Sequence, residues 1–309
     1  GGDSPASIHD EIDVKVSKSQ VKLKSQAALS SIDIRINARY IHAMKPCIVR
    51  AVFLISCIVA VGCGTKREEK SGQHTSVGVV VGIEGDIDSF NPLFAEDITA
   101  GEINDLVFPA LAGSDFDLKS GELRYSPLLA RSWEFTNQGR DIVFHLLTGA
   151  VWSDGKPVTA RDVQLTYELY GDPDVASVRQ AAVEKLRLTN GKLDVSKSVE
   201  VLNDSTVVFH FARAYPGQMF DVGLPIIPAH IFEGIPRKDL RTHAANKSPV
   251  GCGPFALAKW TPLQETTLQP NSSSIVPYPG KLSQLIFRVI PDYRSRLAQT
   301  ASGEIDVVG

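Results

Sequence analysis

Histidine, serine and cysteine are the side chains that most often support nucleophilic or metal-assisted catalysis, and their spacing in this chain favours neither. No serine stands in a G-x-S-x-G turn, and no S-x-x-K motif is framed by the other lactamase motifs. No P-loop or dinucleotide-binding glycine pattern is present. No two histidines are four residues apart, and none lies beside a cysteine pair. We therefore expect no catalytic residues, no metal site and no cofactor. The seven histidines are at positions 9, 42, 74, 145, 210, 230 and 243.

Pairs of acidic residues could act as a general acid and a general base. Glu96-Asp97 and Asp172/Asp174 are such pairs, but both lie in segments typical of solvated loops. Glu96, Asp97 and Ile98 have a second interpretation, because they follow a predicted strand and α/β proteins bind ligands at the carboxyl ends of strands. We take these three residues as the candidate ligand-binding site. An ordinary exposed loop is the alternative.

A predicted strand and a predicted helix position these candidate residues. Val77–Ile83 is a nearly continuous β-branched run, typical of a strand that is buried on both faces. A helix is expected from about Thr99 to Phe108, with Ile103, Leu106 and Val107 on its inner face. The candidate loop therefore joins the end of a buried strand to the start of a helix.

The segment Ser132–Tyr170 contains the clearest local structure signals. Two strands, Trp133–Thr136 and Ile142–Leu147, are separated by a polar turn and form a predicted hairpin. A glycine-containing turn then precedes a helix, which Thr159 and Asp162 begin in the arrangement of a capping box. This segment favours a structural role over a catalytic one.

The remaining segments mix strands and helices without strict alternation, which favours an α/β lobe with an inserted α+β piece. We expect Trp133 and Trp152 to pack in the core of the inserted piece rather than to contact a ligand. The further predicted elements are a helix at Ala176–Leu188, a hairpin at Val199–Phe211, a helix start at Pro228, strands ending at Trp260 and spanning Thr266–Gln269 and Leu285–Ile290, a helix at Tyr293–Ser302 with Leu297 and Ala298 inward, and a strand within Gly303–Val308.

The composition is that of a soluble globular protein. The chain has 309 residues, of which 43% are hydrophobic and 22% are charged, and it could contain two ordinary domains. The net charge of −3 gives no electrostatic argument for a nucleic-acid partner. The four cysteines, at positions 47, 57, 63 and 252, are too few and too unevenly spaced for a disulfide framework or a zinc site.

An apolar segment near the N-terminus predicts a lipoprotein signal peptide over residues 44–63. A short basic stretch precedes the apolar run Ala51–Gly62. This run would rise about 18 Å as a helix, which is shorter than the ~30 Å hydrocarbon core of a bilayer. Ala60–Cys63 resembles a bacterial lipobox, and we expect Cys63 to carry the lipid anchor.

The segments on either side of this signal peptide differ from a folded domain. Residues 1–43 precede Met44, and we interpret them as an upstream extension outside the mature protein. Residues 64–76 are polar and charged, which is typical of a flexible tether between a lipid anchor and a domain.

The order and chemistry of Ser132–Tyr170 resemble the signature of the family-5 extracellular solute-binding lipoproteins, which serve peptide-type ABC importers. The pattern S-W-E-x4-G-x4-F-x-L-x2-G-x-x-W-S-D-G-x-P-V-T-A-x-D-V runs through this segment without a gap. Three other segments match landmarks of that family, and the resemblance covers Val77–Gly309. These landmarks are Asp88–Pro92, Val250–Phe255 and Gly303–Val307.

The resemblance implies a periplasmic-binding-protein-like α/β fold of type II, of the large peptide-binding class. Residues 77–108 and 228–309 would form the core of lobe I, which would be incomplete. Residues 109–227 would form an α+β subdomain inserted into lobe I. Such proteins continue for a further domain, and we therefore expect this chain to be an N-terminal fragment from which lobe II is missing.

The resemblance also implies a binding protein rather than an enzyme. The protein would capture peptides, or a related small solute, and deliver them to ABC permease subunits for transmembrane transport. In oligopeptide-binding relatives the stretch that matches Glu96–Ile98 pairs its backbone with the ligand as an added strand. We expect a monomer that Cys63 anchors by lipid to the membrane, in the periplasm or at the cell surface. The alternatives are a peptide-binding signalling or chaperone lipoprotein on the same fold and, less favoured, a secreted hydrolase.

Overall fold

The computed structural model describes residues 77–309 except 187, 190–191, 277, 279 and 281. The predicted upstream extension (1–43), signal peptide (44–63), lipidated Cys63 and tether (64–76) lie outside the described residues and stay predictions. Among the residues that are described, no helix combines the length and the apolar character that crossing a bilayer requires.

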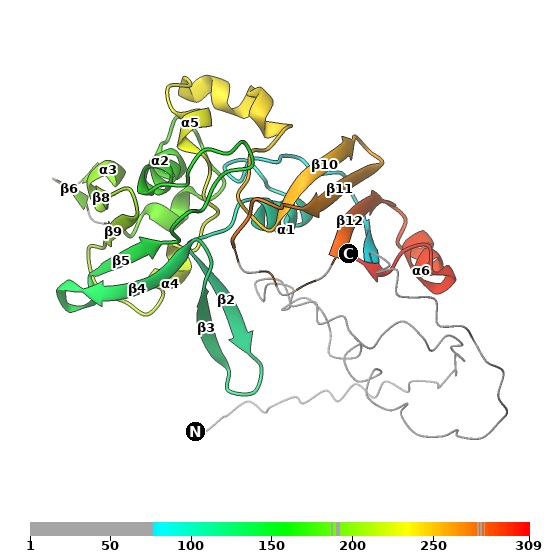
Figure 1. Ribbon diagram of the computed structural model, residues 1–309, viewed down its shortest axis with the longest axis horizontal. Coiled ribbons are helices and arrows are strands. Elements are labelled where there is room, and N and C mark those ends of the chain that lie inside the picture. The colour runs from blue at the N-terminus through cyan, green and yellow to red at the C-terminus, as the bar shows by residue number, and fades with distance from the viewer. Residues whose placement is uncertain (1–76, 187, 190–191, 277, 279, 281) are drawn as a thin grey trace, which may run out of the picture. The chain divides into compact units, whose positions relative to one another are not determined.

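A five-stranded sheet, in the strand order β10-β11-β12-β1-β13, carries the candidate loop (Figure 1). Strand β1 (Val77–Ile83) pairs in parallel with β12 (Leu282–Val289) on one side and with β13 (Val307–Val308) on the other. Strand β11 (Glu265–Pro270) is antiparallel to both β12 and β10 (Phe255–Thr261). The carboxyl ends of β1, β10, β12 and β13 therefore meet at one edge, which we call the carboxyl edge.

Strand β1 is buried more completely on one face than on the other, so the predicted burial on both faces is only partly correct. Val79 and Ile83 are 5% and 2% exposed on the covered face. On the opposite face Gly78 is exposed and Val80 is half-buried. Close packing on that face is found at Gly82, where an added side chain would overlap Ile305.

Helix α1 (Ile98–Val107) follows the candidate loop and packs beside β10. Its inner face is the predicted one except that Leu106 is half-buried and Asn104 is fully buried instead. The segment that leads into β10 lies against the last turn of α1, where the N–H of Gly253 donates to the Val107 carbonyl oxygen at 2.9 Å. A side chain at Gly253 would overlap the Leu106 carbonyl, so this approach requires glycine.

A second sheet of four strands, in the order β4-β5-β9-β8, contains the two predicted hairpins. Helix α2 (Ala160–Gly171) packs against this sheet, and the ring of Tyr167 meets that of Phe209 edge-on, with 4.8 Å between centroids. Trp152 is fully buried here and Trp133 is half-buried, as core packing predicts. The strands are β4 (Ala130–Thr136), β5 (Asp141–Leu146), β8 (Val199–Asn203) and β9 (Thr206–His210).

Polar groups close this second core at the start of α2. The Asp162 carboxylate is 3% exposed and accepts hydrogen bonds from the Thr159 N–H at 2.6 Å and from the Ala229 N–H at 2.6 Å. The first bond belongs to the predicted capping box. The second bond joins α2 to the short helix α5 (Ala229–Phe232), with Pro228 directly before it, as predicted.

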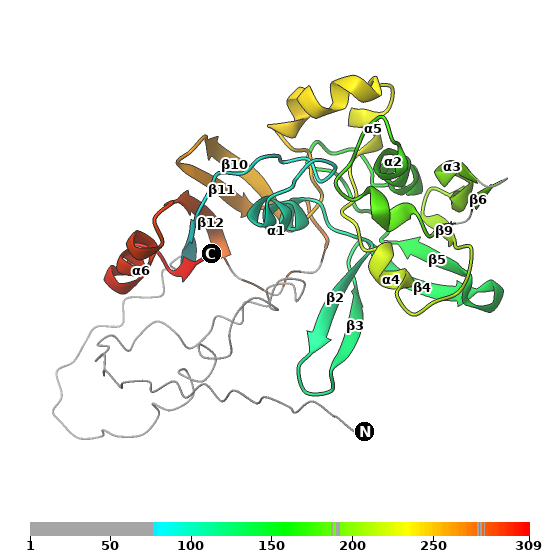
Figure 2. The same ribbon diagram turned by 180° about the vertical axis from the view of Figure 1, so that it is seen from behind.

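A hairpin of β2 (Ala112–Asp117) and β3 (Glu122–Pro127) projects away from both sheets (Figures 1 and 2). The remaining short elements among the described residues connect the larger ones. They are α3 (Val195–Ser198), α4 (Gln218–Asp221), β6 (Leu188–Thr189), β7 (Lys192–Leu193) and 3-10 helices at Asn137–Gly139, Gln180–Val183, Arg237–Thr242 and Ala244–Asn246.

The predicted helix at Ala176–Leu188 is wrong. The segment contains only the 3-10 helix Gln180–Val183, and Leu188 belongs to β6. Ala176 has a positive φ of 51°, which does not continue a right-handed helix. The Ser177 hydroxyl donates to the Leu93 carbonyl oxygen at 2.7 Å. This distant contact holds the start of the segment in a turn.

Helix α6 (Tyr293–Ser302) has the predicted bounds, but its predicted inner face is wrong. Leu297 is 46% exposed and Ala298 is also exposed, whereas Arg296 is buried. The Arg296 guanidinium turns inward because it donates to the Ile290 carbonyl oxygen at 2.6 Å. A long cationic side chain therefore takes the position that the sequence assigned to leucine.

Candidate ligand-binding site

Glu96, Asp97 and Ile98 lie where the loop from β1 reaches α1, on the segment that leaves the carboxyl edge (Figure 1). All three are exposed, and Ile98 is 61% exposed. The Asp97 carboxylate accepts from the Thr99 N–H at 2.8 Å and from the Ala100 N–H at 3.2 Å. Asp97 is therefore the N-cap of α1, a role that aspartate often takes at a helix start.

Asp88 fixes the backbone of the candidate residues. Its Oδ2 atom accepts from the Glu96 N–H at 2.8 Å and from the Asp97 N–H at 3.2 Å. The carbonyl oxygen of Asp97 accepts from the Gly101 N–H at 3.0 Å. A peptide strand added at this position would thus find two backbone donors and one acceptor already engaged.

Asn91 and Asn246 tie this loop to a second segment, residues 241–247. The Asn91 side-chain amide donates to Asn246 Oδ1 at 2.9 Å, and the Phe90 N–H donates to the Asn246 carbonyl oxygen at 3.2 Å. The side-chain amide of Asn246 also donates to the carbonyl oxygen of Leu240 at 2.8 Å. Both asparagines are buried, at 1% and 8% exposed. They hold the two segments side by side.

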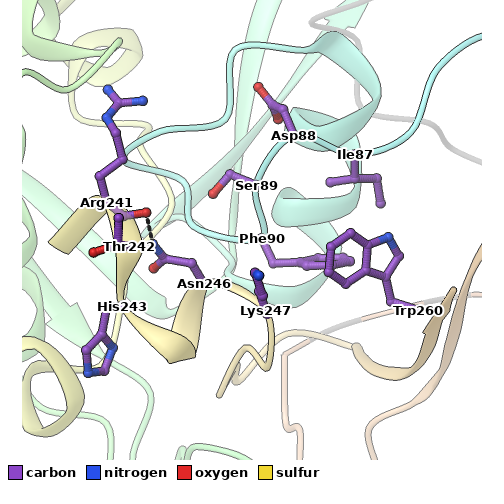
Figure 3. A pocket seen from close by; sticks show the side chains of 10 residues that line it. All are labelled: Ile87, Asp88, Ser89, Phe90, Arg241, Thr242, His243, Asn246, Lys247 and Trp260. Carbon is purple, nitrogen blue, oxygen red and sulfur yellow. Dashed lines mark hydrogen bonds between the residues drawn. The ribbon is translucent and has the colours of Figure 1, made fainter. Parts of the chain in front are cut away.

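A pocket of about 270 Å³ lies between these two segments (Figure 3). Trp260, near the carboxyl end of β10, forms one wall, so the pocket is at the carboxyl edge. Asp88 lines the pocket and also binds the backbone of the candidate residues, which makes the pocket their direct neighbour. The lining residues are Ile87, Asp88, Ser89, Phe90, Arg241, Thr242, His243, Asn246, Lys247 and Trp260.

The acidic residues of α1 and the basic residues at 241–247 differ in their relation to this pocket. Burial raises the pKa of the Glu102 carboxyl on α1, and the nearby charges of Asp105 and Asp97 add to that rise. One side of the pocket is basic, because Arg241 and Lys247 are both exposed there. These acidic residues of α1 do not line the pocket, whereas residues 241–247 give it a basic side.

Within the described part of the chain, no group of three or more histidine, cysteine or acidic side chains is placed to hold a metal ion. Cys252 is fully buried, and burial raises the pKa of its thiol well above the usual range. Such a thiol is a poor nucleophile.

A second pocket, of about 310 Å³, lies in the inserted part of the fold, away from the carboxyl edge. Lys185, Arg213 and Tyr215 line it, together with Ala212. Lys185 and the Tyr215 hydroxyl both bind the Asp221 carboxylate. Asp221 therefore engages the polar groups of Lys185 and Tyr215, and none of the candidate residues lines this pocket.

The predicted triplet lies after β1, as expected, but nothing in the triplet itself identifies its partners. Asp88 is eight residues away, and Asn246 contacts Asn91 across 155 residues. Asp88 and Asn91 belong to a landmark segment noted in the sequence, which was the available signal. Asn246, Arg241 and Lys247 carry no local pattern that would mark them.

Comparisons with known proteins give consistent results. The profile "Bacterial extracellular solute-binding proteins, family 5 Middle" matches residues 124–309. The oligopeptide-binding protein AppA of Bacillus subtilis is 28% identical over 263 residues, which cover 84% of this chain and 45% of AppA. The probable deoxycholate-binding periplasmic protein YgiS of Escherichia coli is 25% identical and covers 71% of this chain and 41% of YgiS. The chain thus spans less than half the length of these relatives.

Solved structures agree in fold. The structure of Bacillus subtilis AppA in complex with a nonapeptide matches with a TM-score of 0.63 and 28% identity, over 74% of this chain and 43% of AppA. The structure of NikZ from Campylobacter jejuni in complex with Ni(L-His) matches with a TM-score of 0.61 and 25% identity, over 74% of this chain and 42% of NikZ. The expected periplasmic-binding-protein-like α/β fold is confirmed.

Proposed function

Because the chain belongs to the bacterial extracellular solute-binding proteins of family 5, we propose that it is the solute-capturing component of a peptide-type ABC importer. The observation that carries this proposal is the match to AppA, a protein whose structure holds a nonapeptide, over 74% of the present chain. The bound peptide would be passed to the permease subunits after the protein closes around it.

The binding site that we propose is the carboxyl edge at Glu96, Asp97 and Ile98. Its support is the position of these residues after β1, their exposure and the adjoining pocket. Because Asp88 already holds two N–H groups of this segment, the added peptide would pair with the groups that remain or displace the Asp88 carboxylate. Main-chain pairing gives affinity without a demand for particular side chains.

The cellular setting follows from the same proposal. Proteins of this family are extracellular or periplasmic binding proteins. For this chain we add a lipid anchor at Cys63 and a monomeric state. The support for the anchor is the short apolar run followed by the lipobox-like Ala60–Cys63. The protein acts by binding alone, with no catalytic step, metal or cofactor.

Native mass spectrometry of the chain with a mixture of tripeptides to nonapeptides tests the solute. Because we expect lobe II to be missing from this chain, we expect peptides of varied sequence to form weak complexes rather than tight stoichiometric ones. Sodium deoxycholate and the nickel–histidine complex are tested in parallel, because YgiS is named for deoxycholate and the NikZ structure holds Ni(L-His). A chain that retains one of these and no peptide would show that the peptide assignment is wrong.

Uptake of a labelled peptide by cells tests transport. Cells that lack this gene are expected to take up less of a peptide that the chain binds. Unchanged uptake would favour the alternative, a peptide-binding signalling or chaperone lipoprotein.

Replacement of Cys63 by alanine should prevent lipid labelling of the protein, and unchanged labelling would contradict the proposed anchor.

A further inference from the structure

The pocket at the carboxyl edge has the size of a subsite rather than of a complete ligand site. Its volume of about 270 Å³ is below the range of roughly 300–1,000 Å³ that is usual for whole small-molecule ligands. It is large enough for one side chain or one terminal group of a longer solute. It adjoins Glu96 and Asp97 through Asp88, so a solute on that segment could reach into it.

The apolar wall of this pocket is fixed in place. The Trp260 indole N–H donates to Asp86 Oδ1 at 3.1 Å, and the other oxygen of Asp86 accepts from the Leu263 N–H at 2.8 Å. The rings of Phe90 and Trp260 meet edge to face, with 5.5 Å between their centroids. The indole is therefore held before any ligand arrives, which lowers the entropic cost of binding.

The cations of the basic wall differ from several other cations on the described surface, which make ion pairs. Lys185 pairs with Asp221 at 2.9 Å, Lys259 with Glu265 at 3.2 Å and Arg161 with Glu233 at 2.8 Å. Within the described residues, neither Arg241 nor Lys247 has a carboxylate within ion-pair distance. The basic residues that do form ion pairs in the described part of the chain are Arg124, His145, Arg161, Lys185, Lys197, His210, His230, Arg237, Lys259 and Arg296.

The one carboxylate in the pocket lining is already engaged. Asp88 accepts two backbone N–H groups through one oxygen, which orients its charge toward the loop backbone. The Arg241 guanidinium lies 4.6 Å from the centroid of the Phe94 ring, near the candidate residues, and Lys247 lies between Asn246 and Trp260 (Figure 3). The Lys247 ammonium therefore lies on the same side of the pocket as the indole, whereas the Arg241 guanidinium points away from both (Figure 3).

We propose that this pocket binds a carboxylate of the solute. Lys247 would hold the carboxylate, and the apolar stem that carries it would pack against the Trp260 indole. The inference rests on the proposed solute-binding function and narrows it to solutes that carry a carboxylate on a short chain. Such a carboxylate has two possible sources in a peptide. One is an acidic side chain, and the other is the C-terminus.

The test follows the Trp260 indole N–H by NMR in the full chain labelled with ¹⁵N-tryptophan. The chain has three tryptophans, and Trp260→Phe assigns the signal. N-acetyl-glutamic acid α-amide carries only a side-chain carboxylate, N-acetyl-alanyl-alanine carries only a terminal one, and N-acetyl-glutamine α-amide carries neither. We expect a saturable shift with at least one of the two acids and none with the neutral amide.

Two lysine variants make the test specific. Lys247→Gln should weaken binding of the acid about tenfold, because a charge-assisted contact is lost. Lys238→Gln removes an exposed lysine three residues before that segment, which does not line the pocket, and should leave the dissociation constant unchanged. Whichever acid binds identifies the source of the carboxylate.

Three outcomes would overturn the proposal. These are no shift with either acid, an equal shift with the neutral amide, and equal effects of Lys247→Gln and Lys238→Gln. The proposed peptide-binding function can be contradicted independently of the carboxylate subsite. If peptides form complexes with the chain while the Trp260 indole N–H signal does not shift with either acid, only the carboxylate subsite is wrong. If the acids bind the pocket and no peptide binds the chain, the subsite stands and the peptide function is wrong.

Discussion

The sheet β4-β5-β9-β8 with helix α2 and the loop between β1 and α1 use carboxylates in different ways. Asp162 in the first region is 3% exposed, and its hydrogen bonds close a core of aromatic rings. Asp88 and Asp97 in the second region are exposed, and their hydrogen bonds shape the backbone of a surface loop. The first arrangement stabilises the fold, while the second leaves a shaped surface available to a solute.

The largest effect should come from the aromatic core. Phe144 on β5 is fully buried, whereas Phe135 on the neighbouring strand β4 is 51% exposed. We expect Phe144→Ala to lower the free energy of unfolding by about 3–5 kcal/mol, because it leaves a cavity. Phe135→Ala is the matched control and should cost less than about 1 kcal/mol. Urea denaturation followed by circular dichroism measures both, and equal losses would contradict the assignment of Phe144 to the core.

A smaller effect is expected where helix α1 meets the segment before β10. Gly253→Ala would place a Cβ atom against the Leu106 carbonyl, and we expect a loss of about 1–3 kcal/mol in the free energy of unfolding. Gly85 lies in the loop after β1, where an added Cβ would have no atom within 4 Å. Gly85→Ala should therefore be nearly neutral. If both variants behave alike, the close approach at Gly253 is not rigid.

The loop should respond locally rather than globally. Asp88→Ala removes the acceptor of the Glu96 and Asp97 N–H groups, so we expect faster hydrogen exchange at these two amides. The free energy of unfolding should change by less than about 1 kcal/mol, since the carboxylate is exposed. Asp115→Ala removes another exposed carboxylate, on β2, and serves as the control. Unchanged exchange at both amides in Asp88→Ala would show that Asp88 does not hold the loop.

The pH dependence of stability should distinguish a buried carboxylate from one at the carboxyl edge. Burial raises the pKa of Asp162, so the folded protein holds this proton more tightly than the unfolded chain. Its contribution to stability is greatest below the ordinary pKa and is lost as pH rises through the raised value. Hydrogen bonds from the Ser295 hydroxyl and N–H lower the pKa of Asp292, the N-cap of α6. Its contribution is complete above the ordinary pKa and is lost as pH falls.

Denaturation of Asp162→Asn and Asp292→Asn over about pH 3 to 6 measures these two contributions. As pH rises, the stability of the unsubstituted chain relative to Asp162→Asn should decrease. Its stability relative to Asp292→Asn should increase over the same range. Two differences that change in the same direction would contradict one of the two assigned pKa shifts.

Local signals explain how much of the fold could be predicted from the sequence. Thr159 with Asp162 marks the start of α2, and Gly303, with φ of 81°, ends α6 at the predicted residue. The failures come from contacts between distant segments. Ser177 binds the carbonyl of Leu93, which prevents the predicted helix at Ala176–Leu188. A local pattern contains no information about such a partner.

The candidate site was predictable only in its position. The end of a strand followed by a helix start places Glu96–Ile98 at the carboxyl edge, which is a property of α/β sheets in general. The pocket beside it depends on Asn246, which joins residues 241–247 to the loop through Asn91. The basic residues Arg241 and Lys247 become meaningful only once this contact is known.

The proposed division between a structural core and a binding edge is tested most directly by NMR chemical-shift mapping. The ¹⁵N-labelled chain is titrated with a peptide that it retains in native mass spectrometry. The amide signals of Glu96, Asp97 and Ile98 should shift with the peptide, while those of β5 and α2 should stay in place. Shifts confined to β5 and α2, with the signals of Glu96–Ile98 unchanged, would contradict the proposed binding edge.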